Sequence, residues 1–305
     1  MLGFQRFPTP IVAIVVAAMK AISYNLLGYL SRYRAAVRCT GIQRIILPLT
    51  TVIQFTVLDA SAGAVHLVAD LVPGQPSSAP AYLTVFEGAL YFRAYDSTHG
   101  HELWRYDGRS AALVKDLLSG PESSDPSYLT VFRNRFYFRA SRDAHSYQLF
   151  SYDGASVSQA RGVVAEDPQY LAVWNGELYF SACDPNSGYE LWRFDGRSAS
   201  LVEDLLPGPD SSHPRDLTVF KDELYFTAFD PTHGCELWKY DGTSASLVKD
   251  IRLGSASSNP SSLTVFDNAL YFAAYDSATG YELWKYTRES TKKESLQGLK
   301  RKKGG

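Results

Sequence analysis

Four glutamates stand at the same place in a repeated word and are the first candidates for chemistry. Glu102, Glu190, Glu236 and Glu282 each open an ELW triplet. A pair of carboxylates can hydrolyse a glycosidic bond when their surroundings push the two pKa values apart. A residue that recurs in almost every repeat has similar surroundings each time. We therefore expect these glutamates to bond backbone or basic groups of a neighbouring repeat.

The other residues of the word also suit a structural role. Aromatic side chains of this size favour packing between repeats over a ring of ligand-stacking groups. An Asp-Gly pair follows four of the five ELW-like words, where positive backbone dihedrals favour a hairpin turn. The residues concerned are Trp104, Trp192, Trp238 and Trp284, with Asp107, Asp153, Asp195 and Asp241.

A second group of candidates lies in a loop that precedes the ELW word. Asp96, Asp184, Asp230 and Asp276 begin this loop, and His99, His145 and His233 lie in it. One Asp per loop supplies too few oxygens for calcium, and the histidines belong to separate repeats. We predict Asp-initiated turns and no metal or cofactor. These residues stay binding candidates because function gathers on loops carried by a rigid scaffold.

One repeat departs from the pattern by gaining arginines. It contains Arg133, Arg135, Arg139 and Arg142, with Ser146 in place of the loop glycine and Phe150 in place of the tryptophan. Such a basic group on an acidic protein can hold a carboxylate or phosphate. Divergence of one repeat explains it as well and is the reading we favour. Arg139 and Arg142 are kept with His145 as binding candidates.

The elements that must position these residues come from an internal repeat. The word LTVF, or LAVW, begins at 83, 129, 171, 217 and 263, at spacings of 46, 42, 46 and 46 residues. Each unit holds four short apolar runs bounded by Gly, Pro, Asp and Ser, which is typical of strands. The runs predict a four-stranded antiparallel meander.

The phase of the apolar residues predicts how the units pack. The LTVF and LYF runs are apolar in both phases of the strand, so we expect these two strands to be covered on both sides. The ELW and SLVKD runs carry charges and are expected nearer solvent. An all-β, five-bladed β-propeller over residues 51–288 satisfies this pattern. The strand at 64–71 is predicted to join the last blade and close the ring; residues 53–59 leave a partial sixth unit as an alternative.

Strand direction places two sets of long loops on one face. The link into the first strand and the loop between the second and third strands share that face, while the tight turns lie opposite. The long-loop face is therefore the expected binding surface. Residues 160–168, ARGVVAEDP, form the corresponding link into the third unit and lack the PG-SS motif of the other links.

These words resemble the ELWxxDGT repeat proteins. Residues 236–243 match the full word, and the resemblance covers roughly residues 64–287. The strand order is also similar to that of kelch propellers and of the tachylectin-2 type of sugar-binding propeller. The resemblance implies a propeller fold and export or surface attachment, and leaves the biochemical role open.

Charge and cysteine content exclude several classes of protein. The formal charge of -2 hides an acidic middle between two basic ends, so the repeats lack the basic face that nucleic-acid binding needs. Three cysteines, Cys39, Cys183 and Cys235, show no zinc spacing. Pairing of Cys183 with Cys235 stays open.

The amino-terminal fifty residues form a separate, hydrophobic and basic segment. Its apolar run at 11–19 suits a signal peptide and predicts a secreted or cell-surface location. A membrane anchor through 11–30 and an organelle-targeting segment are the alternatives. Residues 289–305 are expected to be a disordered basic tail.

The sequence predicts a non-enzymatic binding or scaffold module that recognises a protein or glycan across the long-loop face. No nucleophile and base pair, phosphate loop or cofactor motif is present. A glycosidase-like enzyme using the central channel is the second hypothesis, although the LTVF words offer it no acid. A surface protein that associates with itself is the third.

Overall fold

The computed structural model describes residues 64–74 and 76–288. The predicted segment 1–50, the 53–59 strand and the tail 289–305 lie outside these residues. The chain divides into two compact units, Met1–Val65 and His66–Gly305, and the second contains the repeats. Within the described part, no helix is long and apolar enough to cross a membrane.

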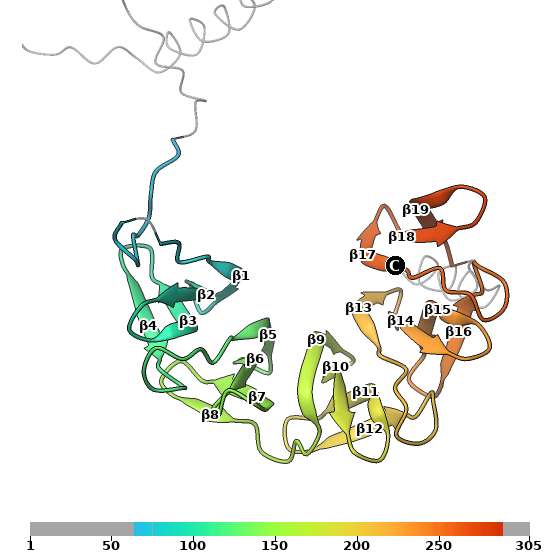
Figure 1. The fold of residues 1–305 in the computed structure, drawn as a ribbon, viewed down its shortest axis with the longest axis horizontal. Coiled ribbons are helices and arrows are strands. Elements are labelled where there is room, and N and C mark those ends of the chain that lie inside the picture. Colours follow the sequence, from blue (N-terminus) through green and yellow to red (C-terminus); the bar gives the residue numbers. More distant parts are fainter. Residues whose placement is uncertain (1–63, 75, 289–305) are drawn as a thin grey trace, which may run out of the picture. The chain divides into compact units, whose positions relative to one another are not determined.

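Five antiparallel sheets, each built from consecutive strands, follow one another along the second unit (Figure 1). We call each sheet a blade. Blade 1 contains β1 (Ala81–Phe86), β2 (Ala89–Asp96), β3 (Gly100–Tyr106) and β4 (Ala111–Lys115); blade 2 contains β5 (Ser127–Phe132), β6 (Arg135–Ser141), β7 (Tyr147–Tyr152) and β8 (Val157–Gln159). Blade 3 contains β9 (Glu166–Trp174), β10 (Glu177–Asp184), β11 (Gly188–Phe194) and β12 (Ala199–Glu203). Blade 4 contains β13 (Arg215–Phe220), β14 (Glu223–Asp230), β15 (Gly234–Tyr240) and β16 (Ala245–Lys249), and blade 5 contains β17 (Ser261–Phe266), β18 (Ala269–Asp276) and β19 (Gly280–Tyr286).

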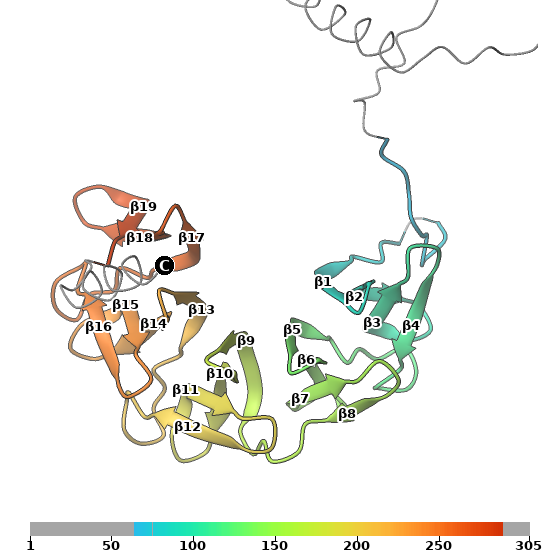
Figure 2. The ribbon, with the colours of Figure 1, turned by 180° about the vertical axis from the view of Figure 1, so that it is seen from behind.

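Local sequence explains the meander. The predicted Asp-Gly turns join the third and fourth strands: Asp107 Oδ1 accepts the N–H groups of Arg109 and Ser110, and Gly108 has φ of 93°. A positive φ costs glycine little, which is why it follows the aspartate. Seen from either side, the first strands of the blades lie innermost and the fourth strands outermost (Figure 2).

The hydrophobic core lies between blades. One face of blade 1 presents Phe86, Tyr91 and Leu103 to Phe136 and Phe138 of blade 2 in a single buried cluster. The same positions form the clusters between blades 2 and 3, 3 and 4, and 4 and 5. Trp192 packs in the cluster between blades 2 and 3.

Burial of the strands differs from the prediction in one respect. The ELW strands were expected near solvent, yet their side chains Glu102, Leu103, Glu190 and Glu236 are fully buried. The innermost strands were expected to be covered on both sides, yet Val85 is 68% exposed. The reason is that the innermost strands form the wall of a central channel, whereas the third strands lie between two blades.

The fifth blade has three strands, and residues 64–70 form no strand in the structure. The predicted pairing of 64–71 with the last blade is therefore not formed here, and closure of the ring is not shown. The inter-blade face of blade 5 is correspondingly uncovered, with Phe266 67% and Leu283 75% exposed. No hydrophobic cluster joins blade 1 to blade 5 among residues 64–74 and 76–288.

Candidate binding surface at the channel mouth

Three of the repeated glutamates link their blade to the start of the next one. Glu102 accepts hydrogen bonds from the N–H and the hydroxyl of Ser124, at 3.0 and 2.6 Å, and from the N–H of Leu117 at 3.3 Å. Glu190 makes the same contacts with Ser212, and Glu236 makes them with Ser258. We call this arrangement the Glu-Ser clamp. It confirms, for Glu102, Glu190 and Glu236, the prediction that the glutamates bond a neighbouring repeat.

Burial controls the protonation of the clamp. Removal from water raises the pKa of Glu102 and of Glu190 to about 7. The donors from Ser124 and Ser212 act in the opposite direction, because they stabilise the ionised carboxylates. Burial also raises the pKa of Glu236. The clamps are enclosed between blades and occupy the interior of the fold.

The predicted loop aspartates lie in turns. Asp96 Oδ1 accepts the N–H groups of Thr98 and His99, each at 2.7 Å, and its second oxygen contacts His99 Nδ1 at 2.7 Å. Asp230 and His233 repeat this geometry, while Asp184 and Asp276 bond Asn186 and Ala278. Each predicted histidine pairs with an aspartate of its own loop or, for His145, donates its backbone N–H to Asp143.

The two arginine candidates of blade 2 lie in different surroundings. Arg139 forms an ion pair with Asp167 of blade 3 and stacks on Tyr147, 3.4 Å from the ring centroid. Arg142 lies 5.1 Å from the Phe150 ring centroid. Arg139 therefore contributes to a junction between blades 2 and 3, and the structure groups it with residues that the repeat pattern did not single out.

The two sets of long loops share one face, as their contacts demonstrate. The N–H of His101, at the start of β3, bonds Ser123 Oγ at 2.9 Å, and a Cβ on Gly100 would lie 2.4 Å from the Glu122 carbonyl oxygen. The loop between β2 and β3 thus rests on the link into blade 2. Glycine at 100 is required by this close approach.

Each innermost strand begins with a β-bulge in which one residue has positive φ. The φ values are 57° at Tyr82, 53° at Tyr128, 54° at Tyr170, 56° at Asp216 and 59° at Ser262. Such values are uncommon outside glycine, and bulges re-aim side chains. The bulge occurs in all five blades, so the scaffold sets the direction of this side chain whatever its identity.

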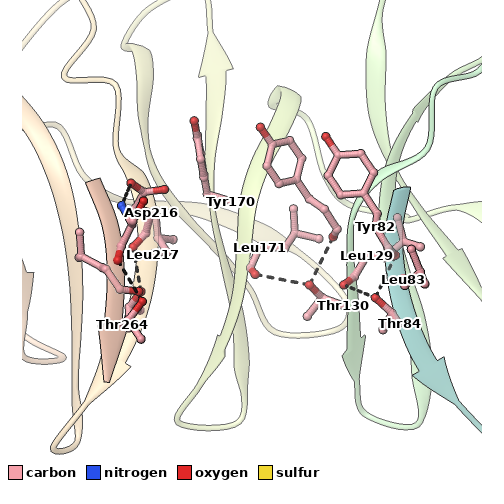
Figure 3. A pocket seen from close by; sticks show the side chains of 14 residues that line it. Tyr82, Leu83, Thr84, Leu129, Thr130, Tyr170, Leu171, Asp216, Leu217 and Thr264 are labelled. Carbon is pink, nitrogen blue, oxygen red and sulfur yellow. Dashed lines mark hydrogen bonds between the residues drawn. The ribbon is translucent and has the colours of Figure 1, made fainter. Parts of the chain in front are cut away.

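These residues line a central cavity of about 400 Å³ that inner strands of all five blades surround. Tyr82 and Tyr170 point toward the same end of it (Figure 3). The ring centroids are 6.1 Å apart for Tyr82 and Tyr128, and 5.1 Å apart for Tyr128 and Tyr170. Along the wall, Thr84 and Thr130 contact the carbonyl oxygens of Leu129 and Leu171 in the next blade.

Asp216 also lines this cavity, at the position that tyrosine occupies in blades 1 to 3. The sequence hypothesis found no acid in the LTVF words, and it missed Asp216 because this residue precedes the word by one position. Its Oδ2 accepts the Ser262 N–H at 3.0 Å. Among the described residues that line the cavity, Asp216 is the single acid.

Three positions around one proline of each blade carry different residues in otherwise similar repeats. We call them the mouth positions, because they lie where the innermost strand leaves the long loop. Before the proline stand Ala79, Asp125, Asp167, His213 and Asn259; after it stand Ala81, Ser127, Gln169, Arg215 and Ser261, and then the bulged residues Tyr82, Tyr128, Tyr170, Asp216 and Ser262. The repeat itself carried this signal, but only the structure brings the bulged residues of the five blades to one cavity.

Charged mouth residues pair across blade boundaries. Arg93 of β2 lies 3.6 Å from Asp125 of the next blade, and Arg139 pairs with Asp167 in the same way. Asp167 also accepts a hydrogen bond from Tyr189 Oη at 2.7 Å. At the boundary between blades 4 and 5, Arg215 contacts Cys235 Sγ at 3.0 Å and Asn259 Oδ1 at 3.3 Å. Cys183 and Cys235 are free thiols, so the disulfide left open by the sequence is not formed.

The five meander blades around a common cavity define an all-β protein of the five-bladed propeller class. Comparison with family models identifies the particular family. Residues 93–302 match the PQQ_2 model, described as outer membrane protein assembly factor BamB. The chain belongs to this family. A comparison with curated proteins found no match.

Solved structures give distant likenesses. The β-propeller domain of the Trilobed protease from Pyrococcus furiosus has 12% identity and a TM-score of 0.47, over 70% of this chain and 66% of that one. The computationally designed Ika8 protein has 16% identity and a TM-score of 0.42, over 70% and 60%. Pyrococcus horikoshii acylaminoacyl peptidase has 11% identity and a TM-score of 0.41, over 64% and 32%. The chain thus spans less than two thirds of these proteins.

Proposed function

We propose that this chain is a non-enzymatic binding module that recognises a protein or glycan at the mouth of its central channel, on the long-loop face. The observation that carries the proposal is where the five repeats differ in sequence. The LTVF, LYF and ELW words change little between blades, whereas the mouth positions carry residues as different as Tyr, Asp and Ser at one bulge.

A purely structural role accounts poorly for this pattern. A position that only had to fit the scaffold meets the same surroundings in every blade and would favour one residue type. The Glu-Ser clamp illustrates this, since it repeats without change at three boundaries. Mouth positions instead combine aromatic, charged and amide groups, the composition expected of a recognition surface.

The enzyme alternative has weaker support. Hydrolysis of a glycosidic bond commonly uses two carboxyl groups on either side of the bond, and Asp216 is the single acid among the described residues lining the channel cavity. The family model also describes an assembly factor, which favours binding. A structural protein that associates with itself through the same face is an outcome that the experiment below separates.

We also propose that the ring is closed by residues 64–71 joining blade 5. Glu282 lacks the clamp contacts that Glu102, Glu190 and Glu236 make with a serine of the next link. By repeat position, Ser78 corresponds to Ser124, Ser212 and Ser258, and Leu71 corresponds to Leu117. Glu282 is exposed and Ser78 is half-buried, so both are available for a fourth clamp.

Apolar surface supports the same closure. Phe266 and Leu283 are uncovered on blade 5, while Phe92 and Trp104 form a cluster on blade 1 that no other blade covers in the described chain. Their counterparts pack together at every other boundary. Burying apolar surface contributes about 25 cal/mol per Å². Closure would also remove the unpaired edge of β19.

Two narrower assignments belong with this proposal. The full word at Glu236–Thr243 supports membership of the ELWxxDGT repeat proteins within the wider family. A secreted or cell-surface location is proposed from the apolar run at 11–19. Sequencing the amino terminus of the protein purified from its native cells, together with surface protease accessibility, tests the location.

The binding role is tested with the full chain on glycan and peptide arrays. A mouth variant, Tyr128→Ala with Tyr170→Ala, is compared with an outer-strand variant, Lys115→Ala with Lys249→Ala. We expect ligands of the wild type to be retained by the outer-strand variant and lost by the mouth variant. Equal loss in both variants, or binding that survives only in the mouth variant, contradicts the proposal. Light scattering at each concentration detects self-association.

A further inference from the structure

A second cavity lies at the mouth beside the central one, between blades 3 and 4. It has a volume of about 600 Å³, within the usual range for small-molecule sites. Gln169, Ser181 and Tyr189 of blade 3 line one side, and His213, Arg215 and Asn259 line the other. Most of its lining residues therefore stand at positions that vary between repeats.

Arg215 is the unusual charge in this cavity. Two arginines of second strands near the mouth each face a carboxylate, since Arg93 pairs with Asp125 and Arg139 with Asp167. Arg215 reaches the corresponding position of blade 5 and meets Asn259, an uncharged amide, and the Cys235 thiol. Within residues 64–74 and 76–288, no salt bridge involves Arg215.

The neighbours of Arg215 do not neutralise it. Asp216 follows it directly but lines the central cavity and bonds the Ser262 N–H. Burial, with a smaller contribution from Arg215, lowers the pKa of His213, so this imidazole is neutral at pH 7. A half-buried guanidinium without a counter-charge is costly. An anionic ligand would supply the missing charge, and a carboxylate matches the guanidinium fork.

The remaining lining suits a sugar ring. Tyr189 and His213 stack with centroids 5.3 Å apart and an interplanar angle of 26°, and Phe229 is 37% exposed beside them. Flat aromatic surface packs against the C–H face of a ring. Gln169, Ser181 and Asn259 add uncharged donors and acceptors that match hydroxyl groups.

We propose that this cavity binds an acidic sugar, with Arg215 holding its carboxylate and the Tyr189 and His213 rings packing on the sugar. The inference rests on the proposed function, because it takes the mouth as the recognition surface, and it adds the chemical class of the ligand. Arg215 is the residue that selects the charge, and the stacked rings select the shape.

Calorimetric titration of the full chain tests the charge. The probes are D-glucuronate, D-glucose, which lacks the carboxylate, and acetate, which lacks the ring. We expect glucuronate to bind at least about tenfold more tightly than either of the others, a difference of about 1.4 kcal/mol. Equal binding of glucose and glucuronate, equal binding of acetate, or no glucuronate binding at tens of millimolar overturns the inference.

Variants locate the effect. Arg215→Gln is expected to lose about tenfold in glucuronate affinity, Arg215→Lys to keep part of it, and Arg93→Gln, at a paired arginine, to match the wild type. Circular dichroism confirms that each variant is folded. If Arg215→Gln binds as the wild type does, the site is wrong. Mouth-dependent array binding without carboxylate preference would leave the proposed function standing and reject only this inference.

Discussion

Glu236 of blade 4 accepts hydrogen bonds from both the N–H and the hydroxyl of Ser258, at 2.7 and 2.5 Å, in the link into blade 5. Both residues are 0% exposed. A carboxylate is suited to this place because each of its oxygens accepts, and an amide in its place would present N–H groups to donors. The repeated glutamate is thus a fastening between blades, and any recognition must come from residues elsewhere.

Replacing a clamp carboxylate should destabilise the fold. We expect Glu190→Gln to lower the free energy of unfolding by about 1–3 kcal/mol, because one buried donor loses its acceptor. Urea denaturation at pH 7 measures the change. The matched control is Glu122→Gln, an exposed glutamate of the long loop, which should stay within about 0.5 kcal/mol of the wild type. Equal effects of the two substitutions would contradict a structural role for the clamp.

The clamp should also make stability depend on pH. The pKa of Glu190 is raised from its ordinary value of 4.5 to about 7, mainly by burial. The folded state therefore holds more protons than the unfolded state between these values, and the free energy of unfolding falls as pH rises from about 4.5 to about 7. The turn aspartates, such as Asp195, have lowered pKa values and act below about pH 4 instead.

Glu190→Gln removes one of these titrating groups. We expect its deficit relative to the wild type to be larger at pH 5 than at pH 8, since only the wild type loses the contribution of Glu190 across that window. Urea denaturation at several pH values measures the difference. A constant deficit from pH 5 to pH 8 would show that burial does not perturb this carboxyl.

Ring closure predicts an effect where the open arrangement predicts none. The side chain of Glu282 is exposed and makes no hydrogen bond within residues 64–74 and 76–288, so Glu282→Gln would be neutral if blade 5 stayed uncovered. If Ser78 completes a fourth clamp, we expect Glu282→Gln and Ser78→Ala each to lower the free energy of unfolding. The double variant should then lose less than the sum of the two single losses, by a coupling energy of about 0.5–3 kcal/mol. Additive or absent effects would reject the closure.

The loop pair of Asp96 and His99 gives a local test of geometry. A hydrogen bond that the His99 imidazole donates to the Asp96 carboxylate raises the pKa of His99 above its ordinary value. We expect Asp96→Asn to lower the pKa of His99 toward 6.5, measured by NMR titration of the imidazole protons. An unchanged His99 pKa would mean that the two side chains do not meet in solution.

Local features of the sequence predicted the blades well. Strand periodicity, the Asp-Gly turns and the repeat spacing all report short-range structure, and the structure forms four-stranded meanders from them. Burial of the ELW strand was predicted wrongly, because a charged glutamate suggests solvent exposure. Its partner, Ser124 for Glu102, lies 22 residues away in another blade.

The mouth could not be assembled from sequence for a similar reason. Tyr82, Tyr128 and Tyr170 lie more than forty residues apart and meet only because bulges of equal geometry repeat around one cavity. Because these positive φ values occur at residues other than glycine, the sequence gives no sign of them. The sequence shows that the repeats differ at these positions. Such differences look like ordinary divergence until the fold places the positions near the channel mouth.

The most direct test of the account exchanges the mouth of one blade for that of another. His213→Asp, Arg215→Ser and Asp216→Tyr together give blade 4 the mouth residues of blade 2 without altering any clamp residue. Array binding and urea denaturation are measured on the same full-chain sample. The account predicts a free energy of unfolding within about 1 kcal/mol of the wild type and a changed set of bound ligands. An unchanged ligand set on a folded protein would contradict recognition at the mouth.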